Sequence, residues 1–193
     1  LKTIALLFHS GWSIERIFRL SFQRMNHLKN APGASGPTPS IAPHYMEFVS
    51  AVKHLRALQV RGSISLSYQE EKGVPQLILH INEEDKNREE AKQFALAVNV
   101  EPGKTRYALS FSPAFNKTDQ VQVVTRSFLG VMFYLSQAVE VPREDILQGK
   151  VTQTKTPDGK IFDWNEVTGD LLRISSLSGN RHEELKSIYY RGA

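Results

Sequence analysis

A run rich in proline, glycine and serine at residues 30–40 separates two kinds of hydrophobic periodicity in this chain. On both sides of the run, up to residue 61, apolar residues recur at the three- and four-residue spacing of helices. From Gly62 onward most segments alternate apolar and polar residues, as half-buried strands do. The run itself suits neither a helix nor a central strand, so we expect a loop there. Helical spacing before Gly62 and strand alternation after it together predict an α+β protein.

In this architecture N-terminal helices pack on a mostly antiparallel β-sheet, with a buried central helix between them. Residues 1–61 are predicted to form a basic helical segment with a loop at 30–43, and residues 62–193 an α+β body that continues the same domain. The helices expected first span 1–8, 13–28 and 45–61. The later elements expected are strands at 64–68, 76–81, 107–111 and 121–125, a helix at 91–98, a short helix beginning at Pro142, a small hairpin around 156–159, and closing strands at 171–177 and 185–190.

The predicted central helix is residues 128–139, which carry apolar side chains on nearly every side, among them Leu129, Met132 and Phe133. A helix that is hydrophobic all round is normally enclosed on several sides. We therefore expect this segment to lie at the centre of the fold.

Basic residues concentrate in the first part of the chain. Residues 1–61 contain 8 Lys and Arg against 2 Asp and Glu, a net charge of +6, whereas the remainder carries −2. On a helix over 13–28, Arg16, Arg19, Gln23 and His27 would lie together opposite the apolar stripe. The candidate binding residues are Arg16, Arg19, Arg24 and His27. Such a face suits anionic lipid, nucleic acid or an acidic protein. In the simpler interpretation the arginines only solvate helix surfaces, or the two parts attract each other.

Cysteine is absent, which excludes disulfides, thiolate zinc sites and cysteine nucleophiles. No apolar run approaches the ~18 residues that span a bilayer. The chain opens on Leu rather than Met, so we expect a processed product from which a targeting segment has been removed.

Motifs for catalysis or cofactor binding are incomplete in this sequence. Gly103-Lys104-Thr105 resembles the end of a phosphate-binding loop, but Val98 stands where that loop needs glycine. The carboxylates Asp158, Asp163 and Glu166 surround Trp164; Asp158 is better explained by its turn, and Asp163 and Glu166 by a solvated loop. No cofactor and no metal site is predicted, since none of the histidines has a second ligand at a known metal spacing; they are His9, His27, His44, His54, His80 and His182. A dispersed Ser/His/Asp site stays open, because its spacing is unconstrained.

Short blocks in several parts of the chain resemble a family of bacterial proteins of unknown activity, some of which are described as lipoproteins. These blocks include Gly11-Trp12-Ser13-Ile14, Asn26-His27-Leu28-Lys29-Asn30, Thr125-Arg126-Ser127, Val139-Glu140-Val141-Pro142 and Tyr190-Arg191-Gly192. The resemblance implies a location in the bacterial envelope or periplasm, with a lipid anchor on the removed N-terminus; a cytoplasmic location is the alternative. It brings no catalytic residues.

Together these observations favour a non-enzymatic interaction or structural protein of the bacterial envelope, whose partner is an unidentified protein or an anionic surface. A hydrolase or transferase with a dispersed active site is the second hypothesis, and would require a deep polar cleft with perturbed carboxylates or a histidine. Nucleic-acid binding through the basic helices is the third. For the leading hypothesis, charge reversal at Arg16, Arg19 and Arg24 is expected to weaken association and leave thermal unfolding nearly unchanged.

Overall fold

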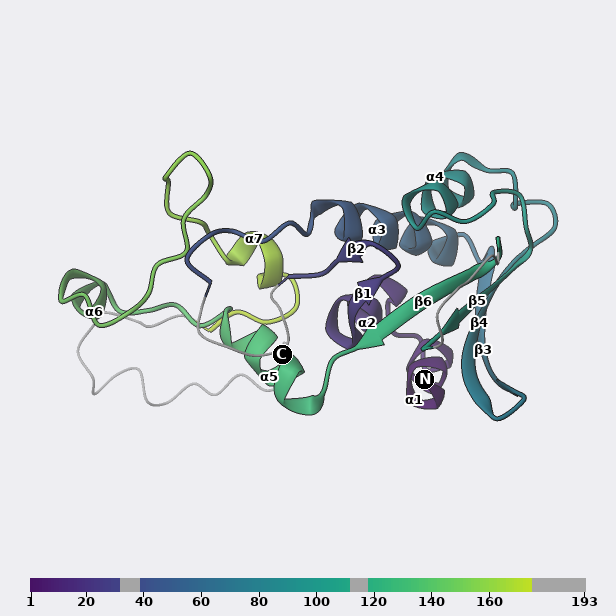
Figure 1. Ribbon diagram of the computed structural model, residues 1–193, viewed down its shortest axis with the longest axis horizontal. Coiled ribbons are helices and arrows are strands. Elements are labelled where there is room, and N and C mark those ends of the chain that lie inside the picture. The colour runs from purple at the N-terminus through teal and green to yellow at the C-terminus, as the bar shows by residue number, and fades with distance from the viewer. Residues whose placement is uncertain (32–38, 112–117, 175–193) are drawn as a thin grey trace.

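Seven helices and one six-stranded sheet make up the described part of the chain (Figure 1). The computed structural model describes residues 1–31, 39–111 and 118–174. Within these residues the helices are α1 (Lys2–His9), α2 (Ile14–Ser21), α3 (Met46–Val60), α4 (Glu89–Ala97), α5 (Phe128–Ser136), α6 (Arg143–Leu147) and α7 (Asn165–Thr168). The strands are β1 (Phe22–Met25), β2 (Leu28–Lys29), β3 (Ile64–Glu71), β4 (Val74–Ile81), β5 (Arg106–Ser110) and β6 (Gln120–Thr125).

The six strands lie in the order β2-β1-β6-β5-β4-β3. Every neighbouring pair is antiparallel except β5 and β6, which are parallel. The α+β class and the mostly antiparallel sheet are therefore confirmed. The predicted hairpin of β3 and β4 closes through a two-residue turn in which Lys72 (φ 52°) and Gly73 (φ 77°) both have left-handed backbone conformations. Positive φ at both central residues is the signature of the tight hairpin turn that matches strand twist.

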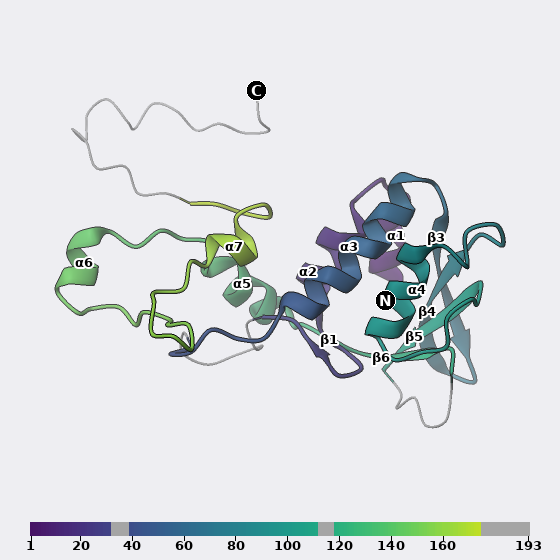
Figure 2. The same ribbon diagram turned by 90° about the horizontal axis from the view of Figure 1, so that it is seen from above.

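Helices α1–α4 gather on one side of the sheet, as Figure 2 shows. The main hydrophobic core fills the space between them and includes the fully buried Phe18, Phe48, Leu66, Phe94 and Leu109. Alternation explains this core, because every second residue of β3 and β5 points toward the helices.

The predicted helix over 13–28 is wrong beyond Ser21. There the chain turns into the hairpin of β1 and β2, and Phe22 and Met25 are buried through pairing with β6 rather than on a helix stripe. Asn26 occupies the tight turn at φ 47°, a region that Asn tolerates better than most residues. Its backbone N–H donates to the Gln122 carbonyl (2.8 Å), and its Oδ1 accepts from the Gln122 N–H (2.8 Å). These bonds fasten the hairpin to β6.

A second, smaller hydrophobic cluster holds α5 and α7 against the start of α3. Its buried members are Ala31, Tyr45, Tyr134 and Val167. Figures 1 and 2 place α5 and α7 near each other beyond the β1 side of the sheet, and α6 farther out at the left end of the molecule. The C-terminal part of the described chain thus has a packing centre of its own.

The predicted central position of 128–139 is wrong. Helix α5 does form, yet only Gly130 and Tyr134 within it are buried, while Phe128, Leu129 and Met132 are 77%, 76% and 51% exposed. The helices and sheet fill their shared core without α5, which touches the rest of the fold through the Tyr134 side. The sequence predicts the apolar character of this segment correctly, but its predicted enclosure by the other helices and the sheet is wrong.

The remaining predictions concern the C-terminal third. The short helix after Pro142 is confirmed as α6, and the 156–159 turn is present, although the small hairpin reduces to one antiparallel bridge between Lys155 and Ile161. Residues 171–174 make only an isolated bridge, from Ile174 to Val139. Residues 175–177 and the second closing strand at 185–190 lie outside the described residues. Among the helices that the structure describes, none combines the length and the apolar character needed to cross a bilayer.

Candidate functional site

The four predicted binding residues do not share a helix face. Arg16 is exposed on α2, Arg24 lies on β1 opposite Lys29 of β2, and His27 is exposed in the hairpin turn. Arg19 is only 3% exposed. The basic surface predicted for one amphipathic helix is therefore split, and Arg19 contributes nothing to it.

Arg19 instead is buried and forms an ion pair with the partly exposed Asp170 in the C-terminal part of the chain. Its Nη1 donates to Asp170 Oδ2 (2.7 Å) and to Glu15 Oε1 (3.2 Å), and its Nη2 donates to Asp170 Oδ1 (2.9 Å) and to the Val167 carbonyl. Two parallel bonds from a guanidinium to one carboxylate are the geometry that gives strong, directional pairing. Charge reversal at Arg19 would therefore break its pairing with Asp170 and lower the stability of the protein. The expectation of nearly unchanged thermal unfolding does not hold for Arg19.

The ionisation of this pair follows from its contacts. Burial alone would lower the pKa of Arg19, but the hydrogen bond and charge of Asp170 and the proximity of Tyr134 raise it. Partial burial alone would raise the pKa of Asp170, whereas the hydrogen bonds and charge of Arg19 hold that pKa below its ordinary value. Both effects favour the charged pair at neutral pH.

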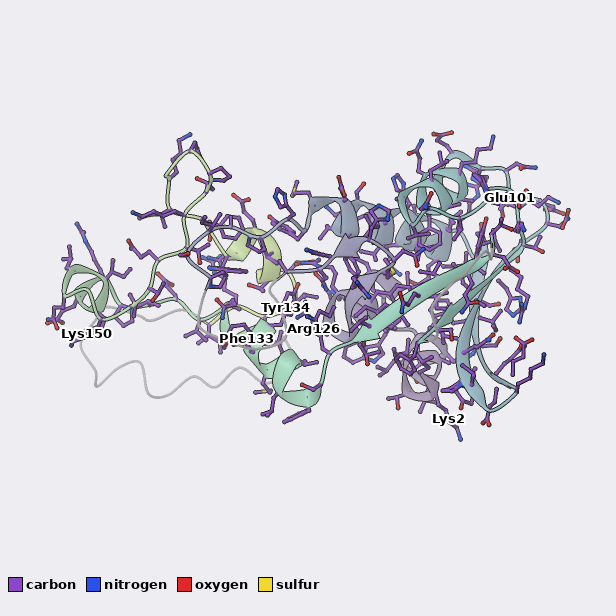
Figure 3. All side chains as sticks on the ribbon, in the orientation of Figure 1. Lys2, Glu101, Arg126, Phe133, Tyr134 and Lys150 are labelled. Carbon is purple, nitrogen blue, oxygen red and sulfur yellow. The ribbon has the colours of Figure 1, made fainter. Side chains whose placement is uncertain are left out.

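Arg126 and Tyr134 extend the buried polar cluster on the other side. The guanidinium carbon of Arg126 lies 4.5 Å from the centre of the Tyr134 ring, within cation–π range, and its Nη2 donates to the Ala31 carbonyl (3.1 Å). The Tyr134 hydroxyl donates to the Val167 carbonyl (3.2 Å). Burial lowers the pKa of Arg126 to about 10 and raises that of Tyr134. Figure 3 shows Arg126 and Tyr134 beside each other where α5 meets the rest of the molecule.

We call the set Arg19, Arg126, Tyr134 and Asp170 the polar joint. Two arginines and a tyrosine there are each at most 7% exposed, so a substrate could not reach them without displacing α5 or α7. The polar joint is therefore suited to holding the C-terminal part in place rather than to catalysis.

Three large apolar side chains close together on α5 are exposed. Phe128 and Met132 are four residues apart and lie nearly in line on the helix, with Leu129 beside them. We call these three side chains the α5 surface. Exposed apolar groups that are contiguous, rather than scattered, mark binding sites more often than chance.

A cavity of about 680 Å³ opens next to the C-terminal end of α5. Its walls are residues 136–141, 151–154 and 161–165, together with Arg143 and Ile146. Phe162 and Trp164 meet edge to face at 5.1 Å in one wall, and Trp164 Nε1 donates to Thr154 Oγ1 (3.0 Å). The volume falls in the range of small-molecule pockets. Its charged lining consists of Glu140, Arg143 and Asp163, none of which forms an ion pair with another.

The remaining sequence candidates have structural roles. Lys104 of the incomplete phosphate loop pairs with Glu101 Oε2 (3.0 Å) and donates to Thr118 Oγ1 (2.8 Å). The pKa of Glu101 is lowered first by the hydrogen bond from Lys104. Figure 3 places Glu101 at the far end of the molecule from α5.

The three carboxylates around Trp164 do not converge on one point. Asp158 is hydrogen-bonded by Thr156 and pairs with Lys160 (2.9 Å), and these contacts, the Thr156 bond first, lower its pKa. Asp163 accepts from the Asn165 backbone N–H (2.9 Å). Across residues 1–31, 39–111 and 118–174, no group of three or more histidines and carboxylates is placed to hold a metal ion.

Sequence reasoning missed Asp170, Arg126 and Tyr134. Arg19 and Asp170 are 151 positions apart, so no local spacing could have paired them. The position of Arg19 on its helix gave no signal either, because it lies opposite the apolar stripe of Ile14, Ile17 and Phe18.

Comparison with known proteins adds no identification: no family model, curated protein or solved structure matches this chain. The family resemblance and the envelope location stay predictions.

Proposed function

We propose that this chain is a non-enzymatic interaction protein of the bacterial envelope and that it binds its partner through the α5 surface. The observation that carries the proposal is the exposure of Phe128, Leu129 and Met132, at 77%, 76% and 51%, on adjacent turns of one helix. Leaving such side chains in water forgoes roughly 1.5–3 kcal/mol each relative to burial. A bound partner that covers them would recover part of this free energy.

The charge pattern supports a protein partner over an anionic surface. Residues 127–139 contain no Asp, Glu, Lys, Arg or His, so the α5 surface offers nothing to attract lipid headgroups or phosphates.

Site-specific photo-crosslinking tests the proposal. A benzophenone amino acid at Leu129 of the full-length protein, expressed in bacterial cells, should give a discrete adduct of higher mass. The same group at the exposed Lys53 of α3 should not give it. Met132→Glu should abolish the Leu129 adduct. Equal adduct patterns at the two positions would contradict an α5 interface.

The location is tested separately by fractionating cells that express the natural precursor. Recovery with the membrane or periplasmic fraction is expected, and recovery with the cytosolic fraction would exclude the envelope part of the proposal.

A further inference from the structure

The α5 surface carries no charged side chain, so its partner needs no opposite charge. From Ser127 to Val139 the chain has no charged side chain, and the first charged residues beyond are Arg126, which is buried, and Glu140. A copy of the same chain, with its formal net charge of +4, can approach this surface without placing like charges against each other.

The size of the apolar surface also matches what a dimer needs. With about 200 Å² taken as the full accessible area of a large apolar residue, the exposed fractions of Phe128, Leu129 and Met132 correspond to about 400 Å². Weak and transient interfaces bury less than about 1,200 Å² in total, or about 600 Å² per partner. With about 65% of that area apolar, such a dimer needs about 400 Å² of apolar area per copy.

The shape of the surface permits symmetric packing. Phe128 and Met132 form a ridge along the helix, and the ridge of one helix can pack into the groove of another. In a two-fold dimer the same patch serves on both copies, so one uncharged ridge is sufficient.

We infer that the partner at the α5 surface is a second copy of this chain, joined through an antiparallel contact of the two α5 helices. This inference rests on the proposed interaction function and specifies its partner. The dimer is of modest affinity, since few polar groups add to the apolar contact.

Sedimentation velocity on the purified full chain tests the inference. Between about 1 μM and about 100 μM, the weight-average mass should rise from 21.8 kDa toward twice that value. Leu129→Glu should raise the dimer dissociation constant at least about tenfold. The matched control is Leu6→Glu on α1, because Leu6 is also an exposed helical leucine (65%), and it should dimerise like the wild type. Thermal unfolding of both variants should match that of the wild type, which shows that a change in dimerisation does not come from misfolding. If Leu129→Glu is less stable, Met132→Glu serves as a second α5 variant.

The outcomes separate the two proposals. A wild-type chain that stays monomeric throughout, or equal weakening by the Leu6 and Leu129 variants, overturns the dimer. If the chain is monomeric and Leu129 still crosslinks to a different protein in cells, the proposed function stands and the second copy is excluded. If neither association is found, both proposals fail.

Discussion

Asp170→Asn is the most informative perturbation of the polar joint. The substitution keeps the shape of the side chain but removes its charge and one of the two oxygens that accept from Arg19, at 2.7 and 2.9 Å. Arg19, only 3% exposed, is then left with the amide oxygen of Asn, with Glu15 at 3.2 Å and with the Val167 carbonyl. The variant tests whether this ion pair fastens the C-terminal part of the fold.

The expected cost follows from these contacts. Breaking a fully buried ion pair costs about 3–5 kcal/mol. The Asp170 side chain is 51% exposed and Glu15 continues to neutralise Arg19, so the cost is reduced to about 2 kcal/mol. For a chain of this size that corresponds to a fall in melting temperature of about 4–8 °C.

Urea unfolding, with the midpoint shift measured at constant m-value, gives the free-energy change. Asp158→Asn is the matched control, because its pair with Lys160 is exposed on both sides and should contribute less than about 1 kcal/mol. Hydrogen exchange should also quicken at residues 165–174 in the Asp170 variant and not at β3–β5. A loss for Asp170→Asn no larger than that of the control would refute the role assigned to the ion pair.

Three further results are expected. The native pKa of Asp170 lies below the unfolded value of about 3.9, so the stability difference between wild type and Asp170→Asn should be complete above about pH 4 and vanish as pH falls through the native pKa; a constant difference down to low pH would disagree. In denaturant titrations, Phe128→Ala should change the unfolding free energy by less than about 0.5 kcal/mol, whereas Phe48→Ala should cost about 3–5 kcal/mol because Phe48 is fully buried. A large effect of Phe128→Ala would mean that α5 is covered in the monomer. Tyr134→Phe should cost about 1 kcal/mol, because the hydroxyl loses its hydrogen bond to Val167 and its interaction with Arg19 while the ring stays under Arg126. Calorimetry that shows no loss would exclude a stabilising role of the hydroxyl.

Local patterns predicted much of the fold. The alternation in Ile64, Leu66 and Tyr68 and the turn at Gly73 located a hairpin that the structure confirms. The helical spacing of Phe48, Val52 and Leu55 located α3, and all three residues are fully buried. These elements could be read because each one's burial pattern is set within a few residues of sequence.

Two elements were misread because their surroundings come from elsewhere in the chain. Phe22 and Met25 are three residues apart, a spacing that fits a helix stripe. In the structure both residues lie on β1, which pairs with β6. The apolar run at 128–139 indicated burial, but α1–α4 and the sheet form the main core without it. Periodicity reports which side chains avoid water and does not report which segment covers them.

The pairing of β1 with β6 also bears on how the chain acquires its fold during synthesis. Phe22 is aligned with Thr125 and Met25 with Val123, so β1 leaves the ribosome long before the strand with which it pairs. Until β6 emerges, β1 lacks the neighbour that completes the sheet, and the growing chain is open to wrong pairings. Closing so distant a contact is a slow step in folding, and factors that protect nascent chains would act on β1 during this interval.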